Sequence, residues 1–142
     1  MGYPTTEEEV RLMRDRLVSD PAEDIEAVMT AEELADCIDD VKRVEFSESL
    51  CRYVAELSAA TRNHPAVELG ASPRASLAMM NAARAFAYIS GRDYVVPEDI
   101  AHLLVPVYAH RIRLRQEVRM KKKDITSVLS EVASSVTPPL RG

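Results

Sequence analysis

The amino-acid sequence predicts an all-α fold, a bundle of about five to six helices. Apolar residues recur every three to four positions along most of the chain, and the periodic segments begin with residues that cap helices. No two segments alternate apolar and polar residues in the way that paired strands would. We therefore expect one helical domain over residues 1–136, followed by a flexible tail over residues 137–142.

The composition is that of a folded globular chain. Of 142 residues, 46% are hydrophobic and 29% are charged, so extensive disorder is not expected. The formal net charge of -5 argues against nucleic acid as a partner. No apolar run reaches the ~20 residues of a membrane span, and the first residues do not have the pattern of a signal peptide. These features favour a cytoplasmic protein without a membrane partner.

Two capping boxes mark the first helices. Thr6 and Glu9 have the spacing of such a box and predict a helix that ends near Ser19, before an Asp-Pro pair. Thr30 and Glu33 repeat the spacing and predict the start of a second helix. After a short segment at residues 44–46 that alternates like an extended chain, Ser47 can cap a third helix. The apolar stripe of this third helix is Leu50, Tyr53, Val54 and Leu57.

The next helix is predicted to be the central one. After a loop at residues 63–71, Ser72-Pro73 has the order of a cap followed by the first helical position, and Gly91 is a stop signal just past Ser90. Apolar residues lie on more than one of its faces. Its main predicted stripe is Ala75, Met79, Ala82, Phe86 and Ile89.

Two more helices follow. Pro97-Glu98-Asp99 opens a helix that Pro106 should kink, and its first-turn acids suit the helix dipole. Val96 precedes it and cannot cap with its side chain, which makes this helix start less stable by about 1 kcal/mol. The stripes of the two helices are Ile100, Leu103, Leu104 and Val107, then Ile125, Val128, Leu129 and Val132.

The sequence shows no catalytic residue and no metal site. The four glycines, at positions 2, 70, 91 and 142, fit neither of the common phosphate-cradling loops. Cys37 and Cys51 are too few and too far apart for a metal knuckle, and we expect them to be buried, reduced and inert. His102 and His110 have a poor metal spacing and suit structural or surface roles, whereas His64 is close enough to residues 69–77 to line a site there.

Arg74 is the residue that stands out. It falls in the first turn of the central helix, where the helix dipole disfavours a cation by about 0.3–1 kcal/mol. A helix start also offers free N–H groups to an anion, and a guanidinium can pair bidentately with phosphate. The residues alone leave two interpretations open, a phosphate-contacting arginine or an exposed arginine that turns back to solvent.

Residues 69–77, LGASPRASL, resemble the motif that opens the sensor-2 helix of MoxR-family AAA+ ATPases. Residues 2–4, GYP, followed by an acidic helix, are similar to the junction that leaves the α/β nucleotide-binding subdomain of this family. Val96 departs from the family, which commonly has Thr or Ser there. The resemblance covers nearly all of residues 2–140 and includes TRNHP at 61–65, GRDYV at 91–95, PEDI at 97–100 and HRIRL at 110–114.

The resemblance implies a helical lid of the AAA+ type, with a sensor-2 helix over about 73–90. By matching position, Arg74 would reach the γ-phosphate of ATP, and Gly70, Ala71, Ser72 and Pro73 would shape the nucleotide site. The ATP-binding loop, the Mg²⁺-coordinating acids and the arginine finger would precede Gly2. The cofactor would be ATP with Mg²⁺ in the full-length parent, and this chain alone is expected to be inactive and to bind no nucleotide tightly.

The resemblance also implies partners. The first is the α/β ATPase subdomain of the parent, and the second is a ring of identical subunits. Members of the family are described as chaperone-like and often act with von Willebrand factor A-domain proteins.

Two other functions remain open from the sequence. One is a DNA-binding helical module that uses residues 110–123, where seven basic residues accompany a single acidic one. The other is a stand-alone protein-interaction adaptor. The acidic residues before position 41 and the basic segment are either ordinary solvated faces or complementary patches, between copies of this chain or towards another subunit.

Overall fold

The computed structural model describes residues 3–17, 25–120 and 124–140. The predicted helix end at Ser19, residues 121–123 of the basic segment and the last two residues of the tail lie outside the described residues. The chain divides into two compact units, residues 1–36 and residues 37–142. The second unit contains the residues of the candidate site.

The predicted all-α fold class is confirmed, and the described residues form seven α-helices where about five to six were expected. The described helices are α1 (Thr6–Arg16), α2 (Ala31–Val41), α3 (Glu48–Asn63), α4 (Pro73–Ile89), α5 (Pro97–Tyr108), the 3-10 helix η1 (Ala109–Arg111), α6 (Gln116–Met120) and α7 (Ile125–Ser135). Two very short strands, β1 (Val67–Leu69) and β2 (Arg113–Leu114), accompany them.

The expectation of no strand pair is wrong in this one place. β1 pairs antiparallel with β2, with Val67 opposite Leu114 and Leu69 opposite Arg113. Strands of two and three residues are too short for alternation to mark them in a sequence. A single parallel bridge between Glu45 and Tyr94 agrees with the extended segment expected at residues 44–46.

Capping boxes begin both N-terminal helices, and the first lies one residue earlier than predicted. The backbone N–H of Thr5, not Thr6, donates to the Glu8 carboxylate at 2.7 Å. The sequence TTEEE allows both registers, and the box forms in the earlier one. In α2 the predicted box is confirmed, since the Thr30 N–H donates to Glu33 at 2.7 Å. These hydrogen bonds lower the pKa of Glu8 and that of Glu33.

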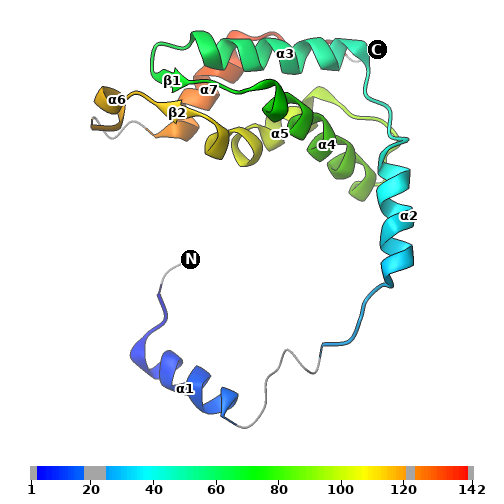
Figure 1. Cartoon of the computed structure of the whole chain (residues 1–142), viewed down its shortest axis with the longest axis vertical. Coiled ribbons are helices and arrows are strands. Elements are labelled where there is room, and N and C mark those ends of the chain that lie inside the picture. Colours follow the sequence, from blue (N-terminus) through cyan, green and yellow to red (C-terminus); the bar gives the residue numbers. More distant parts are fainter. Residues whose placement is uncertain (1–2, 18–24, 121–123, 141–142) are drawn as a thin grey trace. The chain divides into compact units, whose positions relative to one another are not determined.

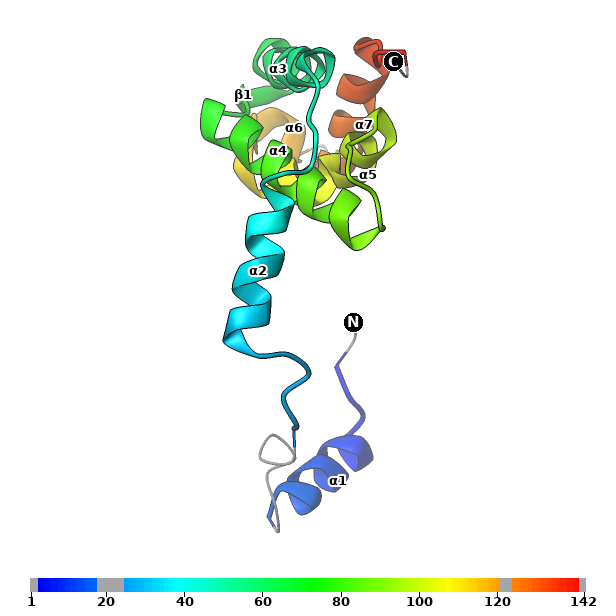
Figure 2. The same ribbon diagram turned by 90° about the vertical axis from the view of Figure 1, so that its right-hand side faces the viewer.

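The core of the second unit lies among α3, α4, α5 and α7. In Figures 1 and 2, α3 and α7 lie on one side of the α4–α5 pair. Ser47 caps α3 as predicted, because its hydroxyl accepts the Leu50 N–H at 3.3 Å. The predicted stripes of α3 and α7 are buried, apart from half-buried Ile125.

The predicted stripe of α4 is only partly right. Ala75 and Met79 are fully buried, but Ile89 is 83% exposed, and Ala82 and Phe86 are half-buried. The core-facing residues recur at every fourth position and are mostly small, which lets neighbouring elements approach closely. This alanine column consists of Ala75, Met79, Ala83 and Ala87, all fully buried.

Glycine ends α4 as the sequence predicts. Gly91 has a φ of +73°, a conformation that favours glycine. Its N–H donates to the Tyr88 carbonyl, and the Arg92 N–H donates to the Ala87 carbonyl, both at 2.9 Å. This is the Schellman arrangement of a helix end. The following helix, α5, continues through Pro106 to Tyr108.

Candidate functional site

The loop before α4 packs directly on the backbone of α3. A Cβ built on Gly70 would lie 2.6 Å from the Cα of Arg62 and 2.7 Å from its backbone nitrogen. These distances are far shorter than ordinary contact, and backbone atoms cannot swing aside. Only glycine therefore fits at position 70, and the loop is seated against the last turn of α3.

Two neighbouring residues of α3 bind the next peptide group of the loop. The Ala71 N–H donates to Oγ1 of Thr61 at 2.9 Å, and Nε of Arg62 donates to the Ala71 carbonyl at 2.7 Å. Ala71 and Thr61 are fully buried. We call this arrangement the Ala71 clamp. Thr61 and Arg62 belong to the segment at residues 61–65 that resembles the family, but this role was not predicted for either residue.

Ser72 occupies the N-cap position of α4, but its side chain does not cap the helix. Instead, its backbone carbonyl accepts the N–H groups of Ala75 at 2.8 Å and Ser76 at 3.3 Å. Pro73 is the first helical residue, as predicted. Both Ser72 and Pro73 are exposed, whereas Ala71 is buried. The end of the loop is therefore accessible to solvent, and Ala71 lies in the core below it.

Arg74 extends from the first turn of α4 and is exposed. Within residues 3–17, 25–120 and 124–140, its guanidinium forms no hydrogen bond and no ion pair. No described carboxylate therefore neutralises this cation. The side chain is free to pair with an anion brought to the start of α4.

Hydroxyl groups anchor the first turn of α4 to two other helices. Oγ of Ser58 in α3 lies 2.8 Å from Oγ of Ser76 and 2.6 Å from Oη of Tyr108 in α5. Ser58 and Tyr108 are fully buried, and the Ser58 hydroxyl also contacts the Val54 carbonyl at 2.9 Å. This hydroxyl network satisfies buried polar groups and fixes the start of α4 against α3 and α5.

Replacing Tyr108 with phenylalanine should lower the free energy of unfolding by about 1 kcal/mol at pH 7. Burial raises the pKa of Tyr108, so the folded chain keeps this hydroxyl neutral at a pH where the unfolded chain ionises it. The contribution of the Tyr108 hydroxyl to the free energy of unfolding is fully present below about pH 10, the pKa of an unfolded tyrosine. This contribution is lost as the pH rises through the raised pKa of the folded chain. Urea unfolding between pH 7 and pH 11 should show a steeper alkaline loss for the original chain than for Tyr108→Phe. If both chains lost stability equally with rising pH, the buried neutral hydroxyl of Tyr108 would be contradicted. Tyr94→Phe is the control, because the Tyr94 side chain is half-exposed.

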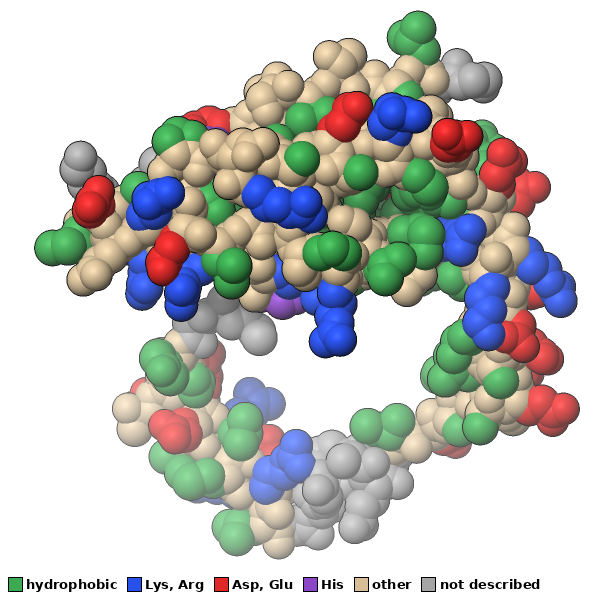
Figure 3. All heavy atoms as spheres, turned by 45° about the horizontal axis from the view of Figure 1, so that its top comes forward, with side chains coloured by type: hydrophobic (Ala, Val, Ile, Leu, Met, Phe, Trp, Pro, Cys, Tyr) green, Lys and Arg blue, Asp and Glu red, His purple; other side chains and the backbone are tan. Residues whose placement is uncertain are grey.

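An apolar hollow of about 470 Å³ lies beside the loop, between α3 and α4. Figure 3 shows apolar side chains on this part of the surface, with cationic side chains around them. Arg62 of the Ala71 clamp and Pro73 at the start of α4 both line this hollow. The other residues that line it are Phe46, Cys51, Val54, Ala55, Ser76, Leu77 and Met80.

An ion pair supports the far end of α4. Nη2 of Arg92 lies 2.7 Å from Oδ1 of Asp99, and Nη1 donates to Oδ2 at 2.9 Å. The Asp99 side chain is only 5% exposed and also accepts the Val96 N–H at 2.9 Å. Asp99 was predicted only as a first-turn acid, and its pairing with Arg92 was not predicted. The bond to Val96 caps α5 from inside the helix, which offsets the missing side-chain cap.

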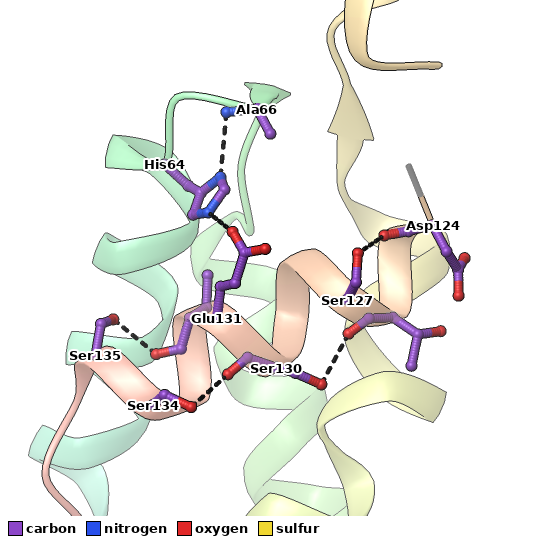
Figure 4. A network of polar contacts seen from close by, with 10 residues as sticks. His64, Ala66, Asp124, Ser127, Ser130, Glu131, Ser134 and Ser135 are labelled. Atoms are coloured by element: carbon purple, nitrogen blue, oxygen red, sulfur yellow. Dashed lines mark hydrogen bonds and ion pairs between the residues drawn. The ribbon is translucent and has the colours of Figure 1, made fainter. Parts of the chain in front are cut away.

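His64 faces α7 and is not in the candidate site. Its Nδ1 accepts the Ala66 N–H at 3.1 Å, so the proton of the neutral ring lies on Nε2, which is 3.1 Å from Glu131 (Figure 4). His102 stacks on Phe86, with ring centroids 5.0 Å apart. These contacts are structural. The expected burial of the cysteines is wrong, because Cys51 is exposed and Cys37 is only half-buried, although both are free thiols.

The described residues contain no cluster of His, Cys, Asp and Glu side chains that could hold a metal ion. None of the described helices is long and apolar enough to cross a membrane. In the basic segment, Arg113 of β2 pairs with Glu68 of β1 at 2.9 Å, so this side chain bridges the two paired strands at the surface.

A comparison with protein families identifies the fold. The model of the AAA lid domain matches residues 59–132, from the last turns of α3 to α7. This match includes the Ala71 clamp and Arg74. The chain belongs to the AAA lid domain family.

Relatives place this lid domain with the MoxR-family AAA+ proteins. It is 36% identical over 99% of its length to protein YeaC of Bacillus subtilis and 29% identical over 98% to Chaperone MoxR1 of Mycobacterium tuberculosis. It is also 33% identical over 65% of its length to Protein MoxR of Paracoccus denitrificans. The aligned part covers 44%, 39% and 31% of these three relatives.

A solved structure from Cytophaga hutchinsonii, named as a presumed ATPase, has the same fold. It superposes with a TM-score of 0.80 at 25% identity and covers 99% of the lid domain. The lid domain covers 45% of that chain. It thus spans less than half the length of each of these relatives.

Proposed function

We propose that this lid couples ATP binding and hydrolysis, performed by an α/β nucleotide-binding subdomain, to movements that remodel or assemble partner proteins. Arg74 is the sensor-2 residue in this proposal, and it pairs with the γ-phosphate of ATP. The exposed, unneutralised guanidinium in the first turn of α4 is the observation that carries it. Membership of the AAA lid family supports nucleotide binding by the protein that contains this lid.

The residues present fit a polyphosphate. Pro73 has no N–H, and the Ala75 and Ser76 N–H groups donate to the Ser72 carbonyl, so among the first residues of α4 the backbone N–H of Arg74 is left for an anion. The dipole of α4 also favours negative charge at this end. Gly70 and the buried Ala71 keep the loop close to α3, while Ser72 and Pro73 form its exposed end. ATP with Mg²⁺ is the proposed nucleotide, and the α/β subdomain would hold the metal.

The chemistry of the lid is electrostatic. A charge-assisted hydrogen bond from Arg74 to phosphate contributes roughly 1.5–3 kcal/mol, and this contact is lost when the γ-phosphate leaves. A ligand shifts a conformational equilibrium only by its different affinities for the two states. The difference between ATP and ADP at Arg74 would therefore set the position of α4 relative to the nucleotide.

The wider function follows the relatives. A ring of identical subunits in the cytoplasm is proposed as the working assembly, with chaperone-like action on partner proteins, including von Willebrand factor A-domain proteins. The name of one relative, Chaperone MoxR1, supports the chaperone-like action. The DNA-binding and adaptor alternatives gain no support from the comparisons.

In the ATPase that contains this lid, Arg74→Ala should lower the preference for ATP over ADP by roughly 10- to 100-fold. ADP affinity and the melting temperature should change little, because the exposed side chain has no partner among the described residues. Calorimetric titration with each nucleotide checks this. The matched control is Arg52→Ala, which removes an exposed arginine of α3. An unchanged ATP preference in Arg74→Ala would refute the sensor role.

A further inference from the structure

We infer that Thr61 and Arg62 are positioning residues that aim Arg74 through the Ala71 clamp. The inference rests on the proposed function, because it concerns how the sensor arginine is held. Neither residue is proposed to touch the nucleotide. Both are proposed to act through the loop that joins α3 to α4.

The clamp fixes one peptide group from both sides. Oγ1 of Thr61 accepts the Ala71 N–H at 2.9 Å and donates its own proton to the Ser58 carbonyl at 2.7 Å. The second bond sets the direction of the hydroxyl, so its lone pair faces Ala71. Nε of Arg62 donates to the Ala71 carbonyl at 2.7 Å.

Burial makes this clamp hard to replace. Thr61 and Ala71 have no exposed surface, so water cannot take the place of the hydroxyl. An N–H left without a partner at this position carries the full desolvation penalty. The loop would have to leave its seat on α3 to recover a hydrogen bond.

The clamp fixes the backbone of Arg74 from its N-terminal side. Only Ser72 and Pro73 separate Ala71 from Arg74, and the proline ring locks one of their four backbone dihedrals. On the other side, the fully buried Ala75 fixes α4 in the core. The Cα of Arg74 therefore lies between two anchored residues, and only its side-chain torsions remain free.

Arg62 suits this role because of its geometry. The guanidinium is planar and its Nε–H projects sideways, so it can donate to a carbonyl close to its own helix. No described carboxylate pairs with Arg62, and its positive charge therefore stays near the loop. A lysine would keep the charge but not the Nε–H.

The test uses the ATPase that contains this lid and measures the affinities for ATP and ADP. Thr61→Val keeps the side-chain shape and removes the acceptor of the Ala71 N–H, whereas Thr61→Ser keeps the hydroxyl. Thr61→Val, Arg62→Ala and Arg62→Lys should each lower the preference for ATP over ADP by roughly 3- to 10-fold. Thr61→Ser should keep the original preference.

Double variants separate positioning from general stability. If the clamp acts through Arg74, Thr61→Val and Arg62→Ala cause no further loss of ATP preference in the Arg74→Ala background. Equal losses in both backgrounds would overturn the inference. A lower melting temperature with unchanged ATP preference would overturn it too.

Two results distinguish this inference from the proposed function. If Arg74→Ala lowers the ATP preference but Thr61→Val and Arg62→Ala do not, the inference fails and the sensor role stands. If Arg74→Ala leaves the preference unchanged, the proposed function fails, and the inference fails with it. The Arg62 side chain is exposed, so Arg62→Ala is expected to fold even if Thr61→Val does not. The ATP preference of Arg62→Ala then tests the inference alone.

Discussion

Replacing Gly70 with alanine is expected to lower the free energy of unfolding of this chain by about 3 kcal/mol. The added methyl group would lie 2.6 Å from the Cα of Arg62 and 2.7 Å from its backbone nitrogen. Neither atom can move without displacing α3. The loop would then leave its seat, and the Ala71 clamp would break together with it.

A second glycine offers the matched control. A Cβ built on Gly91 would have no described atom within 4 Å, but the φ of this residue is +73°. Gly91→Ala should therefore lower the free energy of unfolding by about 1–2 kcal/mol, the penalty for placing alanine in this backbone conformation. Gly91→Asn should lower it by less, because asparagine tolerates the conformation. Urea unfolding at pH 7 measures all three variants. A Gly70→Ala variant as stable as the original chain would show that the loop does not press on α3.

Replacing Arg92 with alanine is expected to lower the free energy of unfolding by about 3 kcal/mol. The change leaves the buried Asp99 carboxylate with one described partner, the N–H of Val96. An unpaired buried charge is among the most destabilising defects in a protein. Asp99→Asn should lower the free energy of unfolding by less than Arg92→Ala, because it removes the buried charge. The Arg92 guanidinium that loses its partner can be hydrated, since a quarter of its side chain already reaches solvent.

A surface ion pair supplies the comparison for Arg92. Arg43 pairs with Asp40 at 2.9 Å, but its side chain is 80% exposed. Arg43→Ala should therefore change the free energy of unfolding by less than about 1 kcal/mol. Thermal and urea unfolding of Arg92→Ala, Asp99→Asn and Arg43→Ala test the predicted order. Equal losses for Arg92→Ala and Arg43→Ala would contradict the assigned role of the buried pair.

Local signals explain what could be predicted of the fold. The caps at Thr30 and Ser47 and the glycine stop at Gly91 depend on atoms within five residues of one another. A sequence shows such neighbours directly. The stripes of α3 and α7 were predicted for the same reason, since each contains large apolar residues at helical spacing.

Contacts between distant or ambiguous residues could not be predicted. β1 and β2 are more than 40 residues apart, and each is too short to have a pattern. Asp99 has the position of an ordinary first-turn acid, so its sequence context hides its pairing with Arg92 across the turn. Cys51 follows the buried Leu50, and the 100° rotation per helical residue places it on the exposed side.

One part of the candidate site could also be predicted from the sequence, and another part could not. The resemblance at residues 69–77 supplied Arg74 and the loop before it, and the structure adds that Arg74 is exposed and without a described partner. The Ala71 clamp has no signal in the sequence, because a threonine and an arginine at a helix end have many uses. The contacts themselves were needed to assign Thr61 and Arg62 a role.

The alanine column of α4 limits how this lid can change over evolution. Its buried members recur at every fourth position, so inserting or deleting one residue inside the helix would rotate everything beyond it by about 100°. Partly exposed and polar side chains would then replace alanines where there is room only for a methyl group. Changes in chain length should therefore be confined to the connecting loops, and the spacing between Arg74 and the turn at Gly91 should persist even as other residues diverge.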